Sequence, residues 1–199
     1  MQSNIEARRL PGQERSRATL QSIMDAATRL IGEHGLDAIS MTQIAELAGM
    51  SKASLYRYFP NKKALLLALA QQSFKIHREE MHAALGSGRH PEEMLRGGID
   101  HYCRQHVDNP FLLHLRAAIH ADPVLSEMDL KDSRENAALI VEFLSHHYPG
   151  LDQQLVQTRA LLIVELLDSL ARLIGRVSSK EQTKLIDEFV NLFLSDLSG

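Results

Sequence analysis

The sequence predicts an all-α protein of about nine helices. Leucine and alanine, both strong helix formers, dominate the longer segments, and the chain has no tryptophan and only 5% aromatic residues. Only 6 prolines interrupt the 199 residues. Apolar side chains recur at spacings of three and four, which places them on one face of a helix. We expect two helical domains, residues 1–62 and 63–199.

The first helix is expected from Arg15 to His34. Its apolar residues share one face, and Gly35 follows at the position where a glycine commonly ends a helix. Residues 1–14 are polar and contain a Pro-Gly pair, so we expect a flexible arm there.

Two short helices follow. Ser40–Gln43 has the S-x-x-Q pattern of a capping box, which opens the first of them, and Gly49 ends it. Ser51 can cap a second helix over 52–59, which Pro60 stops.

The remaining helices are bounded by capping residues, prolines and glycines. They are expected from Asn61 to about Leu85, from Pro91 toward His106, from Pro110 through Ile119, from about Leu130 to Tyr148, from Asp152 to about Val177, and from a second capping box at Ser179–Gln182 to Leu197.

Composition excludes several classes of protein. A single cysteine allows no intrachain disulfide, which fits a reducing compartment. The longest apolar run, Ala64–Ala70, is far shorter than the roughly 20 residues of a membrane-spanning helix, and the N-terminal arginines precede no apolar signal core. We therefore expect a cytoplasmic protein that makes no use of the membrane.

Charge is distributed unevenly along the chain. Residues 1–63 carry nine Lys/Arg against six Asp/Glu, whereas residues 64–199 carry thirteen against nineteen. A basic end on an acidic body indicates that only the N-terminal end meets a polyanion.

Residues 40–59 form a predicted helix-turn-helix, because two short helices are joined by a turn that contains glycine. Leu55 and Phe59 lie four apart and are expected to face the core with Ile44 and Leu47. The opposite face of the second helix would then reach base edges in a DNA major groove.

Each exposed residue type suits a contact with DNA. Lys52 can hydrogen-bond to guanine, and the methyl group of Ala53 can touch a thymine methyl. Hydroxyl groups and the free backbone N–H groups after Ser40 can bind phosphates, and Lys62 is expected to clamp the backbone. The predicted DNA-binding residues are Arg17, Ser40, Thr42, Ser51, Lys52, Ala53, Ser54, Tyr56, Arg57, Tyr58 and Lys62. The alternative is a helical hairpin with a solvated face, but two solvent-facing tyrosines favour a partner.

The strongest motif is the block GMSKASLYRYFPNK, from Gly49 to Lys62. Further matching residues are Ile23–Ala27, Gly35, Ile44–Ala45, Ala48 and Leu65–Leu66. On these residues, positions 15–67, about a quarter of the chain, resemble the N-terminal domain of the TetR/AcrR family of bacterial transcriptional regulators. The rest of the chain agrees with the family in helix number, length and order.

The resemblance implies a homodimer whose recognition helices enter successive major grooves of a pseudopalindromic operator. It places dimerisation on the last two helices, at about 152–177 and 179–197, where apolar residues exceed what one core face needs. The predicted interface residues are Leu162, Leu167, Leu170, Ile174, Phe189 and Phe193. The alternative is that both helices are simply central in the core.

The resemblance also implies a ligand pocket in the C-terminal domain. A ligand would select a conformation in which the recognition helices no longer match the groove spacing, so we expect a repressor that an unidentified, small and mostly apolar effector releases from DNA. Candidates by position alone are Phe74, His101, Tyr102, His106, Phe111, Leu115, Ile119, Phe143 and Leu166, and ordinary core packing is the alternative for each. Arg116 is expected in a surface salt bridge. The rival within the class is an activator or a regulator without a ligand.

We expect no cofactor, no metal and no catalytic residue. Nine of the ten histidines follow residue 64, but none of their spacings aligns ligands on one helix. Glu79 and His82 match one arm of a di-iron carboxylate site, and the rival hypothesis outside the class is a helical enzyme built on this pair; a second arm is missing from the sequence. Cys103 is expected to be a buried apolar residue.

Overall fold

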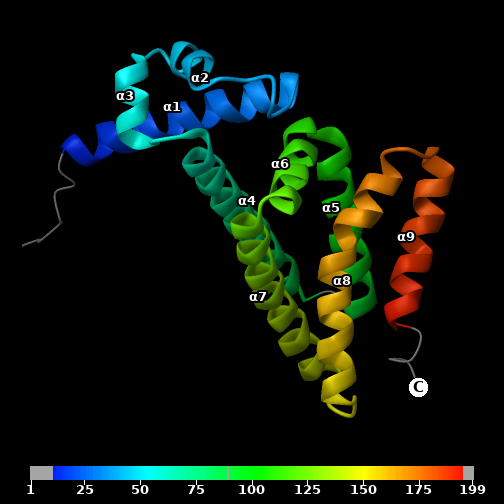
Figure 1. Ribbon diagram of the computed structural model, residues 1–199. Coiled ribbons are helices and arrows are strands. Elements are labelled where there is room, and N and C mark those ends of the chain that lie inside the picture. Colours follow the sequence, from blue (N-terminus) through cyan, green and yellow to red (C-terminus); the bar gives the residue numbers. More distant parts are fainter. Residues whose placement is uncertain (1–10, 89, 195–199) are drawn as a thin grey trace, which may run out of the picture. The chain divides into compact units, whose positions relative to one another are not determined.

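The computed structural model describes residues 11–88 and 90–194, which contain nine α-helices and no strand (Figure 1). The predicted all-α fold is therefore confirmed. The helices are α1 (Pro11–His34), α2 (Met41–Leu47), α3 (Lys52–Tyr58), α4 (Lys62–Leu85), α5 (Pro91–Asp108), α6 (Pro110–Ala121), α7 (Pro123–His147), α8 (Gln153–Ile174) and α9 (Ser179–Leu194). The chain divides into two compact units between Leu69 and Ala70, within α4.

The N-terminal unit contains α1, α2, α3 and the first turns of α4. Its core is built from apolar side chains that each helix turns inward: Ile23, Ala27, Ile31, Ile44, Ala45, Leu55 and Leu65 are all at most 2% exposed. Helix α2 packs against both α1 and α3, so the two short helices gain their stability from tertiary packing rather than from length.

The turns of the N-terminal unit follow the predicted chemistry. The Ser40 side chain accepts a hydrogen bond from Gln43 N, and the Gln43 side chain accepts one from Ser40 N at 2.8 Å, which completes the capping box. Gly35 and Gly49 have φ angles of +76° and +69°, a region that glycine enters without steric cost.

Helix α1 begins at Pro11, four residues earlier than we predicted. Proline suits the first turn of a helix because its missing N–H has no intrahelical partner there. The flexible arm predicted for residues 1–14 is therefore wrong for 11–14, and residues 1–10 lie outside the described part of the chain.

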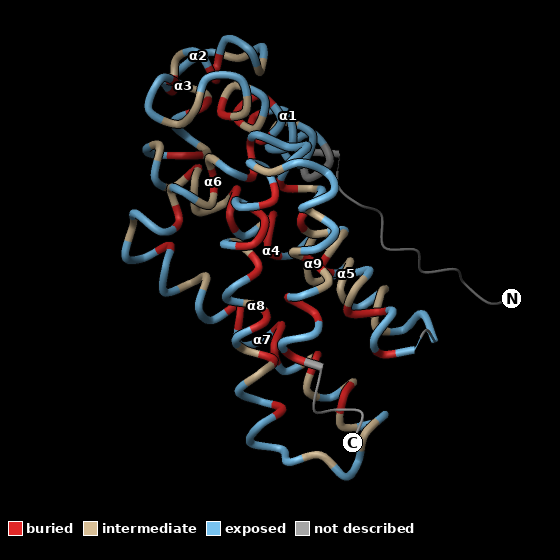
Figure 2. The backbone as a smooth tube through the Cα atoms, turned by 90° about the vertical axis from the view of Figure 1, so that its right-hand side faces the viewer, coloured by how far each residue is buried: buried red, intermediate tan, exposed pale blue. Residues whose placement is uncertain are grey.

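The C-terminal unit contains the rest of α4 and helices α5 to α9. Helix α8 packs against α7 and α5, and α9 packs against α5 and α8. Buried positions recur along each helix and are separated by exposed ones (Figure 2). One buried cluster joins α5, α8 and α9, and a second joins α5, α7 and α8.

Helix α7 begins at Pro123 instead of near Leu130. The Asp122 carboxylate accepts hydrogen bonds from Val124 N at 2.9 Å and Leu125 N at 3.2 Å, and proline stands at the first helical position. Asp122 and Pro123 therefore start α7, about seven residues before the predicted start.

The start of α9 also differs from the prediction by one residue. The Glu181 carboxylate accepts a hydrogen bond from Ser178 N at 3.0 Å, so the capping pair is Ser178 and Glu181 rather than Ser179 and Gln182. The Gln182 side chain instead donates to the carbonyl oxygen of Ile174 at 3.0 Å, at the end of α8.

Within the described ranges, no helix has both the length and the apolar character that crossing a lipid bilayer requires.

Candidate functional site

Helix α3 is capped by Ser51 and Phe59, and the buried side chains of Leu55 and Phe59 anchor it to the core of the N-terminal unit. The Ser51 side chain accepts a hydrogen bond from Ser54 N at 3.2 Å at its start, and Phe59 ends it. Leu55 is fully buried and Phe59 is 6% exposed, so both face the core as predicted. The anchoring of these two residues fixes which side of α3 faces solvent.

Leu47 does not join this core. It is 43% exposed, although we expected it to face inward with Ile44. Met41, Ile44 and Ala45 occupy the inward face of the seven-residue helix α2, and Leu47 lies on its flank.

The outer face of α3 presents Lys52, Ala53, Tyr56 and Arg57, which are all exposed as predicted. The Lys52 Nζ lies 5.8 Å from the centre of the Tyr56 ring, a distance at which a cation is attracted to the π face. This pair gathers a positive charge, a hydroxyl group and an aromatic edge at the first turns of a short helix.

Two other predicted contact residues on α3 are less accessible. Tyr58 is half-buried, so only one of the two tyrosines faces solvent fully. Ser54 is half-buried too, and its hydroxyl accepts a hydrogen bond from Ser51 Oγ at 3.0 Å. Among the remaining predicted residues, Arg17 and Ser40 are exposed and Thr42 is half-buried.

Lys62 has a structural contact that we did not predict. Its ammonium group donates to the carbonyl oxygen of Ile39 at 2.8 Å and to that of Leu36, both in the connection between α1 and α2. Lys62 thus ties the start of α4 to this connection, and its role as a phosphate clamp stays a prediction.

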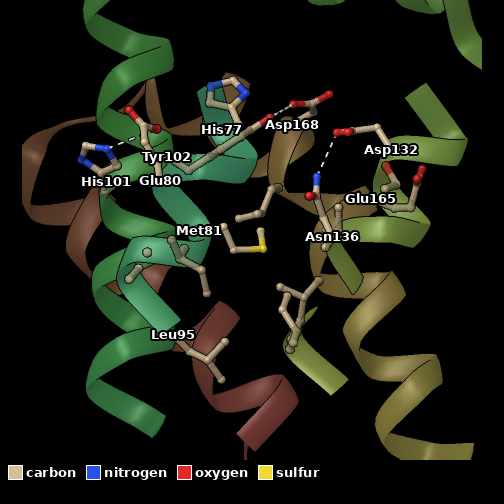
Figure 3. Close-up of a pocket in the computed structure, with 18 of the residues that line it drawn as sticks. His77, Glu80, Met81, Leu95, His101, Tyr102, Asp132, Asn136, Glu165 and Asp168 are labelled. Atoms are coloured by element: carbon tan, nitrogen blue, oxygen red, sulfur yellow. Dashed lines mark hydrogen bonds and ion pairs between the residues drawn. The ribbon is translucent and has the colours of Figure 1, made fainter. Parts of the chain in front are cut away.

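A cavity of about 160 Å³ lies inside the C-terminal unit (Figure 3). Helices α4 to α8 all contribute to its wall. Figure 3 shows Met81 and Leu95 at one part of the wall and a group of acidic and hydrogen-bonding side chains at another. Its apolar lining includes Met81, Leu85, Met94, Leu95, Ile140, Ile163 and Val164.

Arg116 is the centre of the polar part. Its guanidinium group contacts Asp129 at 2.5 Å and Asp168 at 3.3 Å, and it donates to the Tyr102 hydroxyl at 3.2 Å. The Arg116 side chain is only 17% exposed. The salt bridge that we expected for Arg116 is present, but its place at the surface was wrong, because Arg116 belongs to a half-buried ionic network.

Burial governs the proton affinity of the groups around Arg116. Burial raises the pKa of the Asp129 carboxyl, an effect that Arg116 opposes. Burial also raises the pKa of Tyr102, whose hydroxyl donates a hydrogen bond to Asp168 and so remains protonated.

A second polar group lines the cavity on α7. Asp132 forms an ion pair with Arg78, and it accepts a hydrogen bond from Asn136 Nδ2 at 2.9 Å. Asn136 is only 6% exposed, and its Oδ1 atom has no hydrogen-bond partner within the described residues. A buried acceptor without a partner costs free energy and is therefore available for a donor on a bound molecule.

The rings of His77, Tyr102 and His106 contact one another beside the Arg116 network. The ring centres of His77 and His106 are 5.7 Å apart, and those of Tyr102 and His106 are 4.1 Å apart. Burial lowers the pKa of His77 to about 4, so this side chain is neutral near pH 7.

The cavity includes two of the nine residues predicted to bind a ligand, His101 and Tyr102. The other predicted residues lie elsewhere. Phe74, His106, Phe111, Leu115 and Ile119 are buried in the core, Phe143 is half-buried, and Leu166 is 42% exposed.

We did not predict that the charged residues line a cavity, and the predicted site residues did not include Asp129, Asp132, Glu165 or Asp168. Asp168 directly follows Leu166 and Leu167 in α8, and Arg116 directly follows Leu115 in α6, so each stands next to apolar residues. A charged residue next to apolar residues of a helix indicates a buried ion pair, because a charged side chain is rarely buried without a partner.

The residues predicted to form a dimer interface differ in how far they are exposed. Five of the six are at most 9% exposed within their own chain, which agrees with the alternative that these helices are central in the core. These five are Leu167, Leu170, Ile174, Phe189 and Phe193. Leu162 is different, since it is 45% exposed.

Two further residues were weighed for reactive chemistry. Cys103 is fully buried as predicted, and burial raises the pKa of its thiol to about 12. Glu79 forms a surface ion pair with Lys75 at 3.7 Å, the ordinary partner of a carboxylate on an exposed helix face.

Comparison with known proteins covers both units. Residues 23–69 match the model described as "Bacterial regulatory proteins, tetR family", and residues 89–199 match "Tetracyclin repressor-like, C-terminal domain". The chain is 33% identical to an uncharacterised HTH-type transcriptional regulator of Mycobacterium tuberculosis, over 88% of this chain and 85% of that protein. It is 31% identical to the HTH-type transcriptional repressor KstR of Mycolicibacterium smegmatis, over 92% and 90%.

Solved structures show the same fold. The fatty acid degradation regulator FadR from Bacillus halodurans superposes with a TM-score of 0.70 at 22% identity, covering 90% of this chain and 96% of its own. A TetR-family transcriptional regulator from Streptomyces coelicolor superposes with a TM-score of 0.65 at 26% identity, covering 90% and 98%.

Proposed function

Because the chain belongs to the TetR family of bacterial transcriptional regulators, we propose that it is a repressor that binds a pseudopalindromic operator as a homodimer and is released by a small effector. The protein would act in the cytoplasm, where the operator is. The proposal assigns it no catalytic step.

The outer face of α3 is the observation that carries the proposal. Lys52, Ala53, Tyr56 and Arg57 are exposed together at the helix that a helix-turn-helix inserts into the major groove. Lys52 would bond to a guanine, Ala53 would contact a thymine methyl, and Tyr56 would contact a phosphate. Leu55 and Phe59, which face the core on the opposite side of α3, fix the orientation of this exposed face.

A stripe of leucines on α8 supports the homodimer. Leu155, Leu162, Leu166 and Leu173 are each between 42% and 45% exposed, and their spacings of seven, four and seven place them on one side of the helix. Exposed apolar stripes of this kind are typical of helix–helix interfaces between subunits. The interface would therefore use this outer face of α8 and not the five buried residues named above.

The cavity in the C-terminal unit supports release by an effector. A ligand that binds one conformation better than another shifts the population toward it, by at most its difference in affinity for the two. The named repressor KstR, similar along most of the chain, supports repression as the sign of regulation.

The first experiment is a gel-shift titration with DNA from immediately upstream of the protein's own gene, at about physiological salt, against scrambled DNA of equal length. Binding that is selective for the native sequence supports the proposal. Equal affinity for both DNAs would contradict binding at this operator, and failure to bind either DNA even at low salt would contradict the assignment of α3.

Sedimentation equilibrium tests the dimer. Leu162→Asp places a charge on the leucine stripe and should convert the dimer to a monomer without changing the helical circular dichroism spectrum. Val124→Asp is the matched control, since Val124 is 51% exposed in the first turn of α7 and is not part of the α8 stripe. A Leu162→Asp protein that stays dimeric would remove this face of α8 from the interface.

A further inference from the structure

The cavity of the C-terminal unit has an excess of negative charge. Five carboxylates line it, from Glu80, Asp129, Asp132, Glu165 and Asp168, against one lining arginine. An excess of one sign around a partly enclosed cavity favours a ligand of the opposite sign, because the charges are less screened there than in water.

The arginine is already occupied. Arg116 contacts two carboxylates and the Tyr102 hydroxyl, and its guanidinium carbon lies 5.6 Å from the centre of the Phe74 ring. An anionic ligand would have to displace one of these partners and leave a carboxylate partly buried without its counter-charge, which is costly.

The three carboxylates outside this network differ in how far they are neutralised. Asp132 is bonded to Arg78, which approaches from outside the cavity. Glu80 accepts a hydrogen bond from Gln105 at 3.0 Å and lies 3.7 Å from His101, while Glu165 has no ion-pair partner in the described ranges. In the described ranges, no ion pair with a lysine or arginine offsets the half-buried Glu80 or the exposed Glu165, so both carboxylates can face a ligand.

The cavity is also lined by a buried polar side chain, Asn136, and by apolar side chains. The buried Oδ1 atom of Asn136, which has no hydrogen-bond partner in the described residues, is an acceptor that suits an N–H donor. Met81, Leu95 and Ile140 provide apolar contacts for the rest of a molecule. The volume of about 160 Å³ is close to that of cavities that hold a single benzene ring.

We propose that this cavity binds a small organic cation, an amine that carries one aromatic ring or a short alkyl chain. The ammonium group lies between the Glu80 and Glu165 sides of the cavity, and the apolar body contacts Met81 and Leu95. This inference rests on the proposed function, because it names the chemical class of the effector.

Three probes with a common body and different head groups test the sign of the charge. They are 2-phenylethylammonium, 2-phenylethanol and 3-phenylpropionate, each titrated into the full-length protein without DNA by isothermal calorimetry at pH 7. We expect the cation to bind at least about tenfold more tightly than the anion, with the alcohol between them.

Substitutions locate the binding site. Glu80→Gln and Glu165→Gln should each weaken cation binding by about threefold or more and reduce the preference for the cation over the alcohol. Glu79→Gln is the matched control, because Glu79 neighbours Glu80 on α4, pairs with Lys75 on the surface and does not line this cavity. Thermal melting of each variant checks that the fold is retained.

The inference is overturned if the anion binds as tightly as the cation, if none of the three probes binds, or if Glu80→Gln and Glu79→Gln have the same effect. The gel shift separates this result from the proposed function. A cation that binds with the expected preference and leaves the DNA complex intact would support the ligand class and contradict release by an effector.

Discussion

In the N-terminal unit, the side chains that indicate function are exposed and make few contacts with the rest of the protein. Lys52, Ala53 and Arg57 lie on the surface of a short helix whose other side is anchored by Leu55. In the C-terminal unit, the charged side chains around Arg116 are half-buried and form ion pairs with one another.

This difference separates two ways of building a binding site. A surface site requires only that the helix be held rigidly, so substitution of a contact residue should change binding and leave stability almost unaltered. A buried site is part of the core, so substitution of one member should change stability as well. The following predictions test this contrast, beginning with the largest expected effect.

Arg116→Met should lower the free energy of unfolding by about 3–5 kcal/mol, because it leaves Asp129 and Asp168 buried without their counter-charge. Urea denaturation measures the change. Arg104→Met is the control, since Arg104 pairs with Asp100 on the exposed face of α5, and it should change stability little. Equal effects of the two substitutions would show that the Arg116 network is not a structural part of the core.

The neutral His77 predicts acid sensitivity. Its pKa is about 4 in the folded protein against about 6.5 unfolded, so the unfolded state binds the extra proton between these values and stability falls as pH decreases from 6.5 to 4. At pH 4.5 this amounts to about 2–3 kcal/mol. His77→Phe should remove that part of the pH dependence, as measured by urea denaturation at pH 7 and pH 4.5.

Two comparisons make the pH experiment specific to His77. Burial also lowers the pKa of His106, but this contribution is common to both proteins and cancels in their difference. His82→Gln changes an exposed histidine on the same helix and serves as the control. A His77→Phe protein that loses as much stability in acid as the parent would contradict the prediction.

Lys52→Ala should weaken binding to the operator by about 1–3 kcal/mol and relax sequence preference, with unfolding unchanged. A gel shift on operator and scrambled DNA measures both effects, and Lys75→Ala, a surface change in the C-terminal unit, is the control. If affinity for the two DNAs fell equally, Lys52 would be a phosphate contact and not a base contact.

Ser40→Ala should cost about 1 kcal/mol of unfolding free energy, because it removes the side chain that caps α2. Ser22→Ala is the control, since Ser22 lies within α1 and its hydroxyl donates to the Ala18 carbonyl oxygen of its own helix, so no cap is lost. A Ser22→Ala protein as destabilised as the Ser40→Ala protein would contradict a specific capping effect.

The two units also differ in how far the sequence predicts them. Caps and turns depend on residues a few positions apart, so the Ser40 capping box, the end of α2 before Gly49 and the exposure of Lys52 and Tyr56 on α3 were predicted correctly. The cavity depends on residues brought together from five helices, as with Arg116, Asp129 and Asp168, and no local pattern contains that information.

The same limit explains the buried residues assigned to the dimer interface. Periodicity shows that Leu167 and Leu162 are both on apolar faces of α8, but it does not show which face the rest of the chain covers. The covering helices α5 and α9 decide this, and they enclose Leu167 and leave Leu162 exposed.

The burial of Cys103 has a practical consequence for spectroscopy. With a pKa of about 12, only on the order of one thiol in 10⁵ is ionised at pH 7, and the side chain is shielded from reagents. A cysteine introduced at exposed Ala53 would therefore react selectively with a maleimide dye while the native thiol is left in place. In a homodimer, two such labels would report the separation of the α3 helices by energy transfer, with and without a ligand.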